Sequence, residues 1–346
     1  MKRLLLSAVV SAWLCTTAQA AELSPLKSDS EPDRTDWSQL DTRYGPMPKA
    51  DKSLKIGGVS KTLTNEYWRL LGQGYKNAAQ RYGVIVEYQA AANEADQLGQ
   101  LSIAETMIAQ GFSGLLVSPQ TDINLEPALQ TATSRQIPVV NVNDAVMPNA
   151  PHYVGNVQKD NGVRVAQWFI QHKPQGGKLA VIEGQPGVYA AGQRTRGFKE
   201  TIALHNTFNI VASVPANWSR EQAYNAASTI LQQHPDLIGF YANNDTMALG
   251  VVEAVRALNK ADQVAVLGTD GISDAYASIK RGELTGTVDS FPVLTGEVAM
   301  DVMLRLIGGQ TISRVVATPQ ALITKDNAEA FSTKDNEKLR QLLMAH

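Results

Sequence analysis

Cysteine is almost absent from this sequence, and no long hydrophobic run occurs beyond its first twenty residues. The single cysteine, Cys15, lies in the apolar N-terminal stretch, so the rest of the chain can form neither a disulfide bond nor a zinc–thiolate site. No later stretch reaches the roughly 18 apolar residues that a membrane-spanning helix requires. We therefore expect a soluble protein held together by its hydrophobic core alone.

Positive charge is not in excess, and histidine is sparse. The formal net charge is −2, and loss of Lys2 and Arg3 with the first twenty residues changes it to −4, so no basic surplus exists for binding phosphates. Phosphate-loop, zincin, hydrolase-elbow and dinucleotide-binding motifs are missing. We expect no nucleic-acid partner, no cofactor, no metal and no enzymatic activity. The five histidines lack metal-ligand spacing: His152, His172, His205, His234 and His346.

The N-terminus has the three parts of a secretory signal peptide. Two basic residues precede an apolar run over residues 4–14, and residues 18–20 form a cleavage site of small side chains. The apolar run is too short to remain as a membrane helix. Leu14 before Cys15 is too large for a typical lipoprotein cleavage site. We predict that the chain is exported, cleaved after Ala20 and not anchored to lipid.

The rest of the chain repeats one unit, in which a short β-branched run is followed by a loop, an amphipathic helix and a glycine or proline stop. Such repetition is typical of a parallel sheet covered by helices. About 325 residues are too many for one hydrophobic core, and the pattern restarts near Gly155. We predict an α/β protein with two Rossmann-like lobes, whose parallel sheets are joined by a hinge of several crossing segments.

The restart of the pattern also sets the predicted domain boundaries. A helix over residues 293–307 is left over after the second lobe, and we expect it to return to the first lobe. The predicted segments are an N-terminal lobe of residues 53–155 and 291–313, a C-terminal lobe of residues 156–290 and 314–324, and a C-terminal tail of residues 325–346.

Residues 21–52 differ in composition from the lobes, because they are rich in Ser, Pro, Asp and Lys and lack an apolar period. We interpret this leader as a disordered extension. The alternative is that Trp37 and Tyr44 make it pack across a lobe or contact a partner.

Polar and aromatic side chains follow the strands of both predicted lobes. Open α/β sheets bind their ligands in the crevice outside the carboxyl ends of the strands. Aromatic rings can stack on the C–H faces of a sugar, while Asn, Asp and Arg side chains match its hydroxyl groups. The candidates that combine these chemistries are Asn65, Tyr67, Trp68, Asn143, Asp144, Arg194, Trp218, Asn244 and Asp270.

Five short segments carry a family resemblance. They are Thr64-Asn65-Glu66-Tyr67-Trp68, Arg194-Thr195-Arg196-Gly197-Phe198, Pro215-Ala216-Asn217-Trp218, Asn244-Asp245-Thr246-Met247-Ala248-Leu249-Gly250 and Gly268-Thr269-Asp270-Gly271. On these segments the sequence from about residue 54 to 326 resembles the periplasmic ribose- and galactose-type sugar-binding proteins, the type I periplasmic binding proteins of ABC importers. The resemblance implies sugar contacts by the segments' polar and aromatic residues and by the hinge residue Ser290.

The resemblance also implies a mechanism. A monomer in the periplasm would close its hinge around a monosaccharide or polyol and deliver it to the membrane permease of an ABC importer. Two departures argue against ribose itself, since Asn143-Asp144 stands where ribose binders have Asp-Arg, and Ser290 where they have Gln. An alternative function is a periplasmic sensor that docks on a membrane histidine kinase, of the type that senses an autoinducer or trimethylamine oxide.

Local structure offers competing explanations for some candidates. Trp68 shares the core-facing stripe of its helix, and Arg194 with Asp270 could form a purely structural ion pair. We interpret Asp245 as a helix cap rather than a ligand contact.

Overall fold

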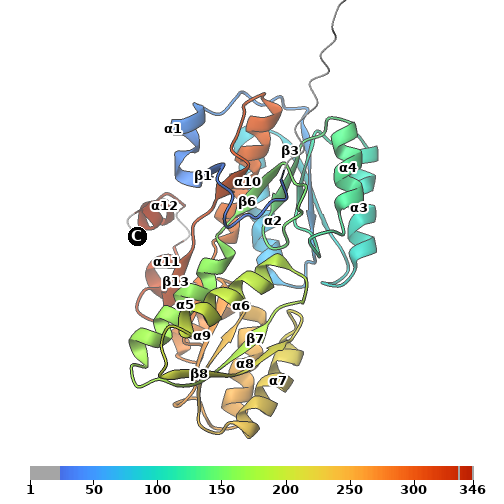
Figure 1. Ribbon diagram of the computed structural model, residues 1–346. Coiled ribbons are helices and arrows are strands. Elements are labelled where there is room, and N and C mark those ends of the chain that lie inside the picture. The colour runs from blue at the N-terminus through green and yellow to red at the C-terminus, as the bar shows by residue number, and fades with distance from the viewer. Residues whose placement is uncertain (1–23, 334–335, 345–346) are drawn as a thin grey trace, which may run out of the picture.

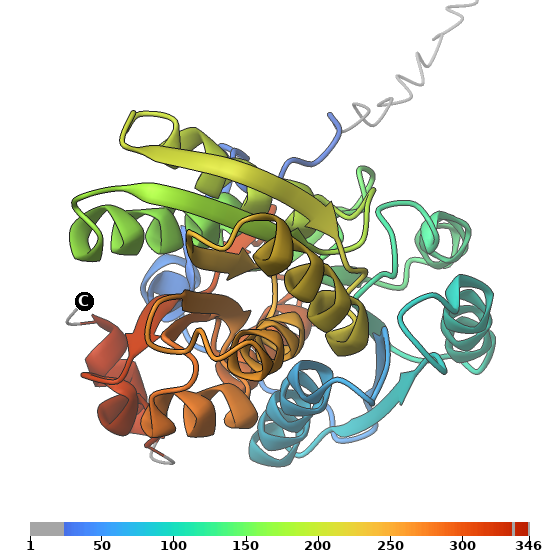
Figure 2. The ribbon, with the colours of Figure 1, turned by 90° about the horizontal axis from the view of Figure 1, so that it is seen from below.

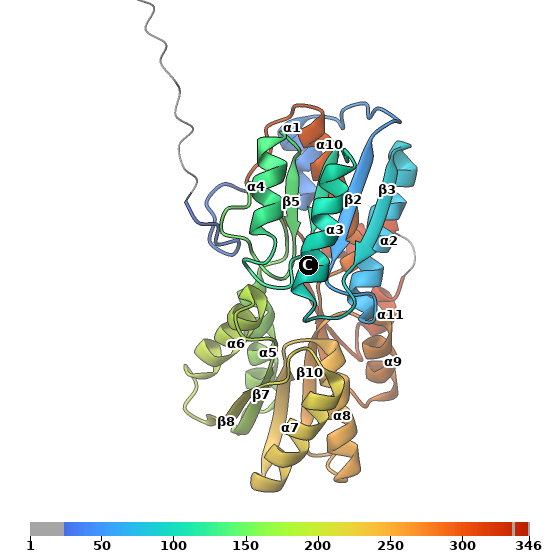
Figure 3. The same ribbon diagram turned by 90° about the vertical axis from the view of Figure 1, so that its right-hand side faces the viewer.

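The computed structural model of the protein describes residues 24–333 and 336–344. They form two α/β lobes, which lie one above the other in Figure 1 and are seen from the side in Figure 3. The predicted signal peptide, with Cys15 and the cleavage site after Ala20, falls outside the described residues. None of the helices in the described ranges combines the length and apolar character that a membrane span requires.

The N-terminal lobe is built on a seven-stranded sheet in the order β1-β12-β6-β5-β4-β2-β3, in which every neighbouring pair is parallel. Strands β4 and β5 are buried at every position, as parallel strands between helices should be. The strands are β1 (Arg34–Asp36), β2 (Lys55–Ser60), β3 (Ile85–Ala90), β4 (Gly114–Val117), β5 (Val139–Val142), β6 (His152–Gly155) and β12 (Val315–Ala317). The helices are α2 (Glu66–Tyr82), α3 (Gln97–Ala109), α4 (Glu126–Ser134) and α10 (Pro292–Ile307).

The C-terminal lobe has a six-stranded sheet in the order β13-β11-β10-β9-β7-β8, parallel except for the β11–β13 pair. Figure 2 shows this lobe from below. The strands are β7 (Gly177–Glu183), β8 (Phe208–Pro215), β9 (Leu237–Ala242), β10 (Ala265–Asp270), β11 (Gly286–Asp289) and β13 (Ala321–Thr324). The helices are α5 (Gln158–His172), α6 (Tyr189–Ile202), α7 (Arg220–Gln233), α8 (Asp245–Ala257) and α9 (Ser273–Arg281).

Three short segments connect the lobes: residues 156–157, 290–291 and 318–320. The third differs from the sequence prediction, which assigned residues 314–324 to the C-terminal lobe as one unit. Strand β12 instead joins the N-terminal sheet beside β6, and only β13 joins the C-terminal sheet. Pro319 lies between the two strands and has no backbone N–H to continue a ladder, so the extended run divides there.

Helix α10 returns to the N-terminal lobe and packs closely against α2 through two glycines. A Cβ atom on Gly74 would lie 2.1 Å from the carbonyl oxygen of Val293, and one on Gly296 would lie 2.3 Å from that of Leu71. The two helix backbones can therefore approach only because side chains are missing at both positions. This contact fixes α2, whose first turn carries candidate binding residues.

The leader is ordered from residue 24 onward, so its interpretation as a disordered extension is wrong for the described part. Strand β1 pairs with β12 at the edge of the N-terminal sheet, and the leader continues through η1 (Trp37–Gln39) and α1 (Leu40–Tyr44). Trp37 and Leu40 are buried. The alternative prediction, packing across a lobe, describes the leader correctly, because its few apolar side chains and an open sheet edge suffice to hold it.

The C-terminal tail also packs against the molecule, as helices α11 (Ala328–Phe331) and α12 (Asn336–Met344). The guanidinium of Arg340 on α12 lies 5.1 Å from the ring centroid of Trp37. The two ends of the described chain therefore meet beside the N-terminal lobe.

Candidate ligand-binding site

Nine of the ten predicted binding residues line a single cavity between the lobes. The empty space among its lining residues, open solvent included, is about 300 Å³. Ser290 is the predicted residue that does not line it, and Glu94 is a lining residue that was not predicted. The lining residues are Asn65, Tyr67, Trp68, Glu94, Asn143, Asp144, Arg194, Trp218, Asn244 and Asp270.

The N-terminal lobe supplies aromatic side chains from the first turn of α2. Asn65 caps this helix, because its side-chain oxygen accepts the Tyr67 N–H at 3.0 Å. The rings of Tyr67 and Trp68 meet edge to face, 4.9 Å apart. Trp68 belongs to the buried stripe of α2, as the sequence indicated, and lines the cavity as well. The helix start thus holds two rings toward the space between the lobes.

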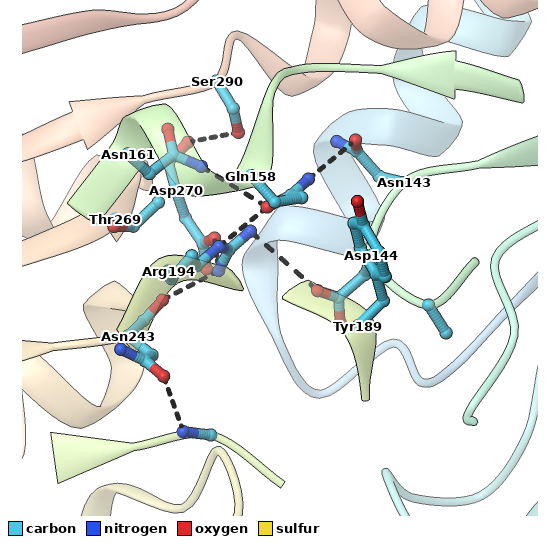
Figure 4. A network of polar contacts seen from close by, with 12 residues as sticks. Asn143, Asp144, Gln158, Asn161, Tyr189, Arg194, Asn243, Thr269, Asp270 and Ser290 are labelled. Atoms are coloured by element: carbon cyan, nitrogen blue, oxygen red, sulfur yellow. Dashed lines mark hydrogen bonds and ion pairs between the residues drawn. The ribbon is translucent and has the colours of Figure 1, made fainter. Parts of the chain in front are cut away.

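Arg194 of α6 is the central cation of the site and is only 3% exposed. Its Nε donates to Gln158 Oε1 at 2.9 Å, and its Nη1 donates to the carbonyl oxygen of Asn243 at 2.7 Å. Nη1 also lies 3.5 Å from Asp270 Oδ1, and Nη2 lies 3.9 Å from Asp144 Oδ1. Figure 4 shows these partners converging on the guanidinium from both lobes. The ion pair with Asp270 therefore exists, and it forms part of the cavity wall.

Lys61 is a second buried cation at the site, which the sequence analysis did not identify. Its Nζ lies 2.6 Å from Asp144 Oδ2 and 5.7 Å from the ring centroids of both Trp68 and Trp218. Glu94 was missed as well, although its Oε1 accepts from Trp68 Nε1 at 3.1 Å. Lys61 follows the end of β2 and Glu94 follows the end of β3. This position after a strand is the feature of the sequence that could have identified them.

Trp218 approaches the cavity from the loop between β8 and α7 and has a left-handed backbone with φ of +63°. Its ring lies over Gly184, where a Cβ atom would come within 2.0 Å of the ring edge. Three other cavity residues have positive φ, namely Asn143, Asp144 and Asp270. Because positive φ is disfavoured for residues with a side chain, this concentration indicates backbone strain around the cavity.

The capping of α8 differs from the prediction. Asn244, not Asp245, is the N-cap residue, and its side-chain oxygen accepts the Met247 N–H at 2.9 Å. Asp245 is fully buried behind it and accepts the backbone N–H groups of Gly271 and Ile272 at 2.8 and 3.1 Å. Asp245 therefore braces the loop after Asp270, whereas Asn244 lines the cavity while it caps the helix.

Ser290 lies in the hinge beneath the cavity. It is fully buried, and its hydroxyl donates to the backbone carbonyl of Asp270 at 3.5 Å. This contact links the second hinge crossing to a residue of the cavity wall.

Burial controls the ionisation of the site. It raises the pKa of the Asp270 carboxyl well above its ordinary value, and the neighbouring Arg194 guanidinium opposes this shift. Burial also raises the pKa of Glu94, against the opposing effect of Lys61. For Arg194, burial would lower the pKa, but Asp270 and Asp144 outweigh it and raise the pKa. The charges of the site therefore depend on one another.

Several buried polar atoms of the cavity have no hydrogen-bond partner within the described residues. They include the indole N–H of Trp218, Asp144 Oδ1 and Glu94 Oε2. Buried polar groups are normally satisfied, so one donor and two acceptors remain for a molecule that offers both kinds of group. No cluster of three or more His, Cys, Asp or Glu that could hold a metal ion occurs within residues 24–333 and 336–344.

Comparison with known proteins identifies the family. The periplasmic binding protein domain matches residues 56–311. A D-allose-binding periplasmic protein of Escherichia coli is 32% identical over 255 residues, which cover 71% of this chain and 82% of that protein. A ribose import binding protein of Bacillus subtilis is 30% identical over 275 residues, which cover 79% of this chain and 88% of that protein.

A solved structure agrees with these relatives. It is an ABC transporter periplasmic solute binding protein from Actinobacillus succinogenes with bound D-allose, which is 31% identical and superposes with a TM-score of 0.77. The match covers 80% of this chain and 99% of that one.

The fold and these matches define a two-lobed solute-binding protein. The chain belongs to the periplasmic binding protein family, in its type I sugar-binding branch. The predicted family resemblance and the predicted fold of two α/β lobes are confirmed. The relatives are transport binding proteins and not enzymes, which confirms the prediction that the chain has no catalytic function.

Proposed function

We propose that this chain captures a monosaccharide or related polyol between its lobes and delivers it to an ABC sugar importer. The observation that carries the proposal is the convergence of nine predicted residues, from separate elements of both lobes, on one cavity. Scattered residues with structural roles alone would have no reason to share a cavity.

The chemistry of the cavity fits a sugar. Trp68, Tyr67 and Trp218 offer apolar ring surface for C–H groups. The atoms of Trp218, Asp144 and Glu94 that have no hydrogen bond offer a donor and acceptors for hydroxyl groups. Arg194 and Asp270 add charged partners, whose hydrogen bonds are stronger than those between neutral groups. Binding requires no covalent chemistry from these residues.

Asp144 lines the cavity and is held by Lys61 from behind the wall, and it favours a compound with several adjacent hydroxyl groups. D-Allose, bound by a relative and by the solved structure above, meets that demand. Myo-inositol is a cyclic polyol with the same capacity. We therefore propose a hexose or cyclic polyol in preference to ribose.

The remaining proposals concern how the chain takes part in transport. The chain acts as a monomer in the periplasm after cleavage behind Ala20, closes on its ligand by a rotation about the three hinge segments, and docks on the permease of the importer. One relative named above is a ribose import binding protein and the solved structure is an ABC transporter solute binding protein, which favours this role over the sensor of a histidine kinase.

A thermal-shift series tests the proposal. The mature chain is heated with D-allose, D-ribose, myo-inositol and trimethylamine oxide, because a ligand that binds only the folded state raises Tm. We expect the largest shift with D-allose or myo-inositol. Arg194→Ala should abolish the shift, since it removes the guanidinium that contacts both Asp270 and the Asn243 carbonyl.

Arg196→Ala is the matched control, because Arg196 lies two residues further along α6, exposed and paired with Glu200. It should keep the full ligand-induced shift. The proposal fails if no sugar or polyol raises Tm, or if the Arg194 variant responds as the parent chain does.

A further inference from the structure

Three helices of the C-terminal lobe begin without a capping side chain of their own. The residues at their N-cap positions are the aliphatic Val157 for α5, Val188 for α6 and Ile272 for α9. Helices α7 and α8 of the same lobe have conventional caps, Ser219 and Asn244. The first N–H groups of a helix have no partner inside it, so the three aliphatic starts need acceptors from elsewhere.

The leader supplies the acceptor for α5. Both oxygens of the Asp29 carboxylate are used, since Oδ1 accepts the Gln158 N–H at 3.0 Å and Oδ2 accepts the Lys159 N–H at 2.7 Å. The leader itself is attached to the N-terminal lobe, because β1 pairs with β12 and the Leu26 N–H donates to the carbonyl of Pro148 at 2.8 Å. Asp29 therefore caps a helix of one lobe from a segment that belongs to the other.

The N-terminal lobe supplies the other two acceptors. Asp122, in the loop between β4 and α4, accepts the N–H of Tyr189 at the start of α6 at 3.2 Å. Glu66, in the first turn of α2, accepts the N–H of Ser273 at the start of α9 at 3.0 Å. Each uncapped helix of the C-terminal lobe thus receives one carboxylate from across the gap between the lobes.

We infer that Asp29, Glu66 and Asp122, here called the latch carboxylates, hold the closed form of the protein by capping helices of the opposite lobe. A carboxylate at a helix N-terminus satisfies free N–H groups and interacts favourably with the helix dipole. Rotation of the lobes away from each other breaks these contacts, so their free energy favours the closed form alone. This inference rests on the proposed capture of a ligand by hinge closure.

The latch contacts lie next to the cavity without forming part of its wall. Beside the Asp122 contact, the Ala190 N–H donates to the backbone carbonyl of Asp144 at 3.2 Å, and Asp144 lines the cavity. Beside the Asp29 contact, the side chain of Gln158 accepts from Arg194. The latch carboxylates therefore set how long the ligand stays enclosed, although they do not touch it.

The test replaces each latch carboxylate by alanine and measures the dissociation rate of D-allose by stopped-flow tryptophan fluorescence. Loss of one cap should speed dissociation about fivefold, with little change in the association rate. Glu66→Gln and Asp122→Asn, which keep an acceptor oxygen but lose the charge, should give intermediate rates. Asp96→Ala is the matched control, because Asp96 caps α3 within its own lobe by accepting the Gly99 N–H at 3.0 Å.

A second readout needs no ligand. The chain has no cysteine after Cys15, so spin labels can be placed uniquely at the exposed positions Leu98 on α3 and Gln232 on α7. In the latch variants, fewer molecules should show the short label-to-label distance of the closed form. Asp96→Ala should leave the distance distribution unchanged.

The inference is overturned if all three alanine variants keep the parent dissociation rate and distance distribution, or if Asp96→Ala changes both as strongly. A parent chain that binds neither D-allose nor any other sugar would instead refute the proposed function, and the label distances would still test the latch.

Discussion

At the scale of single residues, the cavity is formed by side chains whose backbone is held in disfavoured conformations. Eight non-glycine residues in the described ranges have positive φ, and four of them, Asn143, Asp144, Trp218 and Asp270, line the cavity. Each such residue costs on the order of 1–3 kcal/mol. The surrounding fold must supply that free energy, and the result is a fixed orientation of the side chains that face the cavity.

Gly184 gives a direct test of this orientation. Gly184→Ala places a methyl group against the Trp218 ring, which must move, at a cost of about 1–3 kcal/mol. We expect the affinity for D-allose to fall roughly tenfold or more by calorimetric titration. Gly192→Ala on α6 is the control, because a Cβ there meets nothing within 4 Å. It should keep the affinity and raise stability by about 1 kcal/mol; equal affinities in the two variants would contradict the role of Trp218.

Sequence reasoning predicted most of the residues that line the cavity because the motifs that carry them are local. Asn65, Arg194 and Asp270 were each found from a few neighbouring residues. Lys61 and Glu94 were not found, since a lone charge after a strand looks like a solvated one until the fold buries it. The capping role was assigned to Asp245 instead of Asn244, because both residue types cap helices and only the backbone decides which of two neighbours does so.

At the scale of elements, a buried carboxylate with a raised pKa stands at the end of β11, just before the second hinge crossing. Asp289 ends β11 and accepts the Tyr276 hydroxyl at 2.7 Å and the Phe291 N–H at 2.6 Å. Burial raises its pKa to about 7, against the opposing effect of these two hydrogen bonds. The carboxyl in the folded protein therefore keeps its proton at pH values where the unfolded chain has lost it.

The raised pKa of Asp289 determines whether stability rises or falls with pH. Between about pH 4 and 7 the folded state binds more protons than the unfolded state, so stability is greatest at the acidic end and falls as pH rises. Asp289→Asn should flatten that fall and make the protein more stable at pH 8, by on the order of a few kcal/mol. Urea unfolding of both proteins at pH 5, 6, 7 and 8 measures the free energy of unfolding at each pH.

The pH experiment needs a control for general charge effects. Asp236→Asn serves, because Asp236 is exposed and hydrogen bonding to Lys178 lowers its pKa, so it is ionised in both states throughout this range. A fall in stability that is identical in the parent and the Asp289 variant would contradict the assigned pKa. Part of the slope below pH 6 should persist in the variant, since burial also raises the pKa of Asp245 and of Asp301 to about 6.

Elements were predicted well from the sequence where their pattern was long and poorly where it was short. The strand–helix repeats predicted the central strands of both sheets, because buried parallel strands and amphipathic helices have distinct periods. Strands β1 and β12 have three residues each and no readable period. Strand β12 forms because it pairs with β6 of a sheet already built, and β1 then completes the edge beside β12. The partner of each strand lies far away in the sequence.

At the scale of the whole molecule, the leader and the C-terminal tail are additions to a conventional two-lobed protein. The solved relative with bound D-allose is matched over 99% of its length but accounts for only 80% of this chain. The additions meet where Arg340 lies over Trp37, and the leader reaches the C-terminal lobe through Asp29. They therefore extend the contacts between the lobes without entering the cavity.

The central claim is that a sugar binds between the lobes, and a crystal structure of the mature chain grown with D-allose tests it most directly. We predict one molecule in the cavity, with its ring against Trp218 and hydroxyl groups within hydrogen-bonding distance of Arg194, Asp144 and Asp270. A sugar bound elsewhere on the protein, with this cavity closed and filled by side chains alone, would contradict the account.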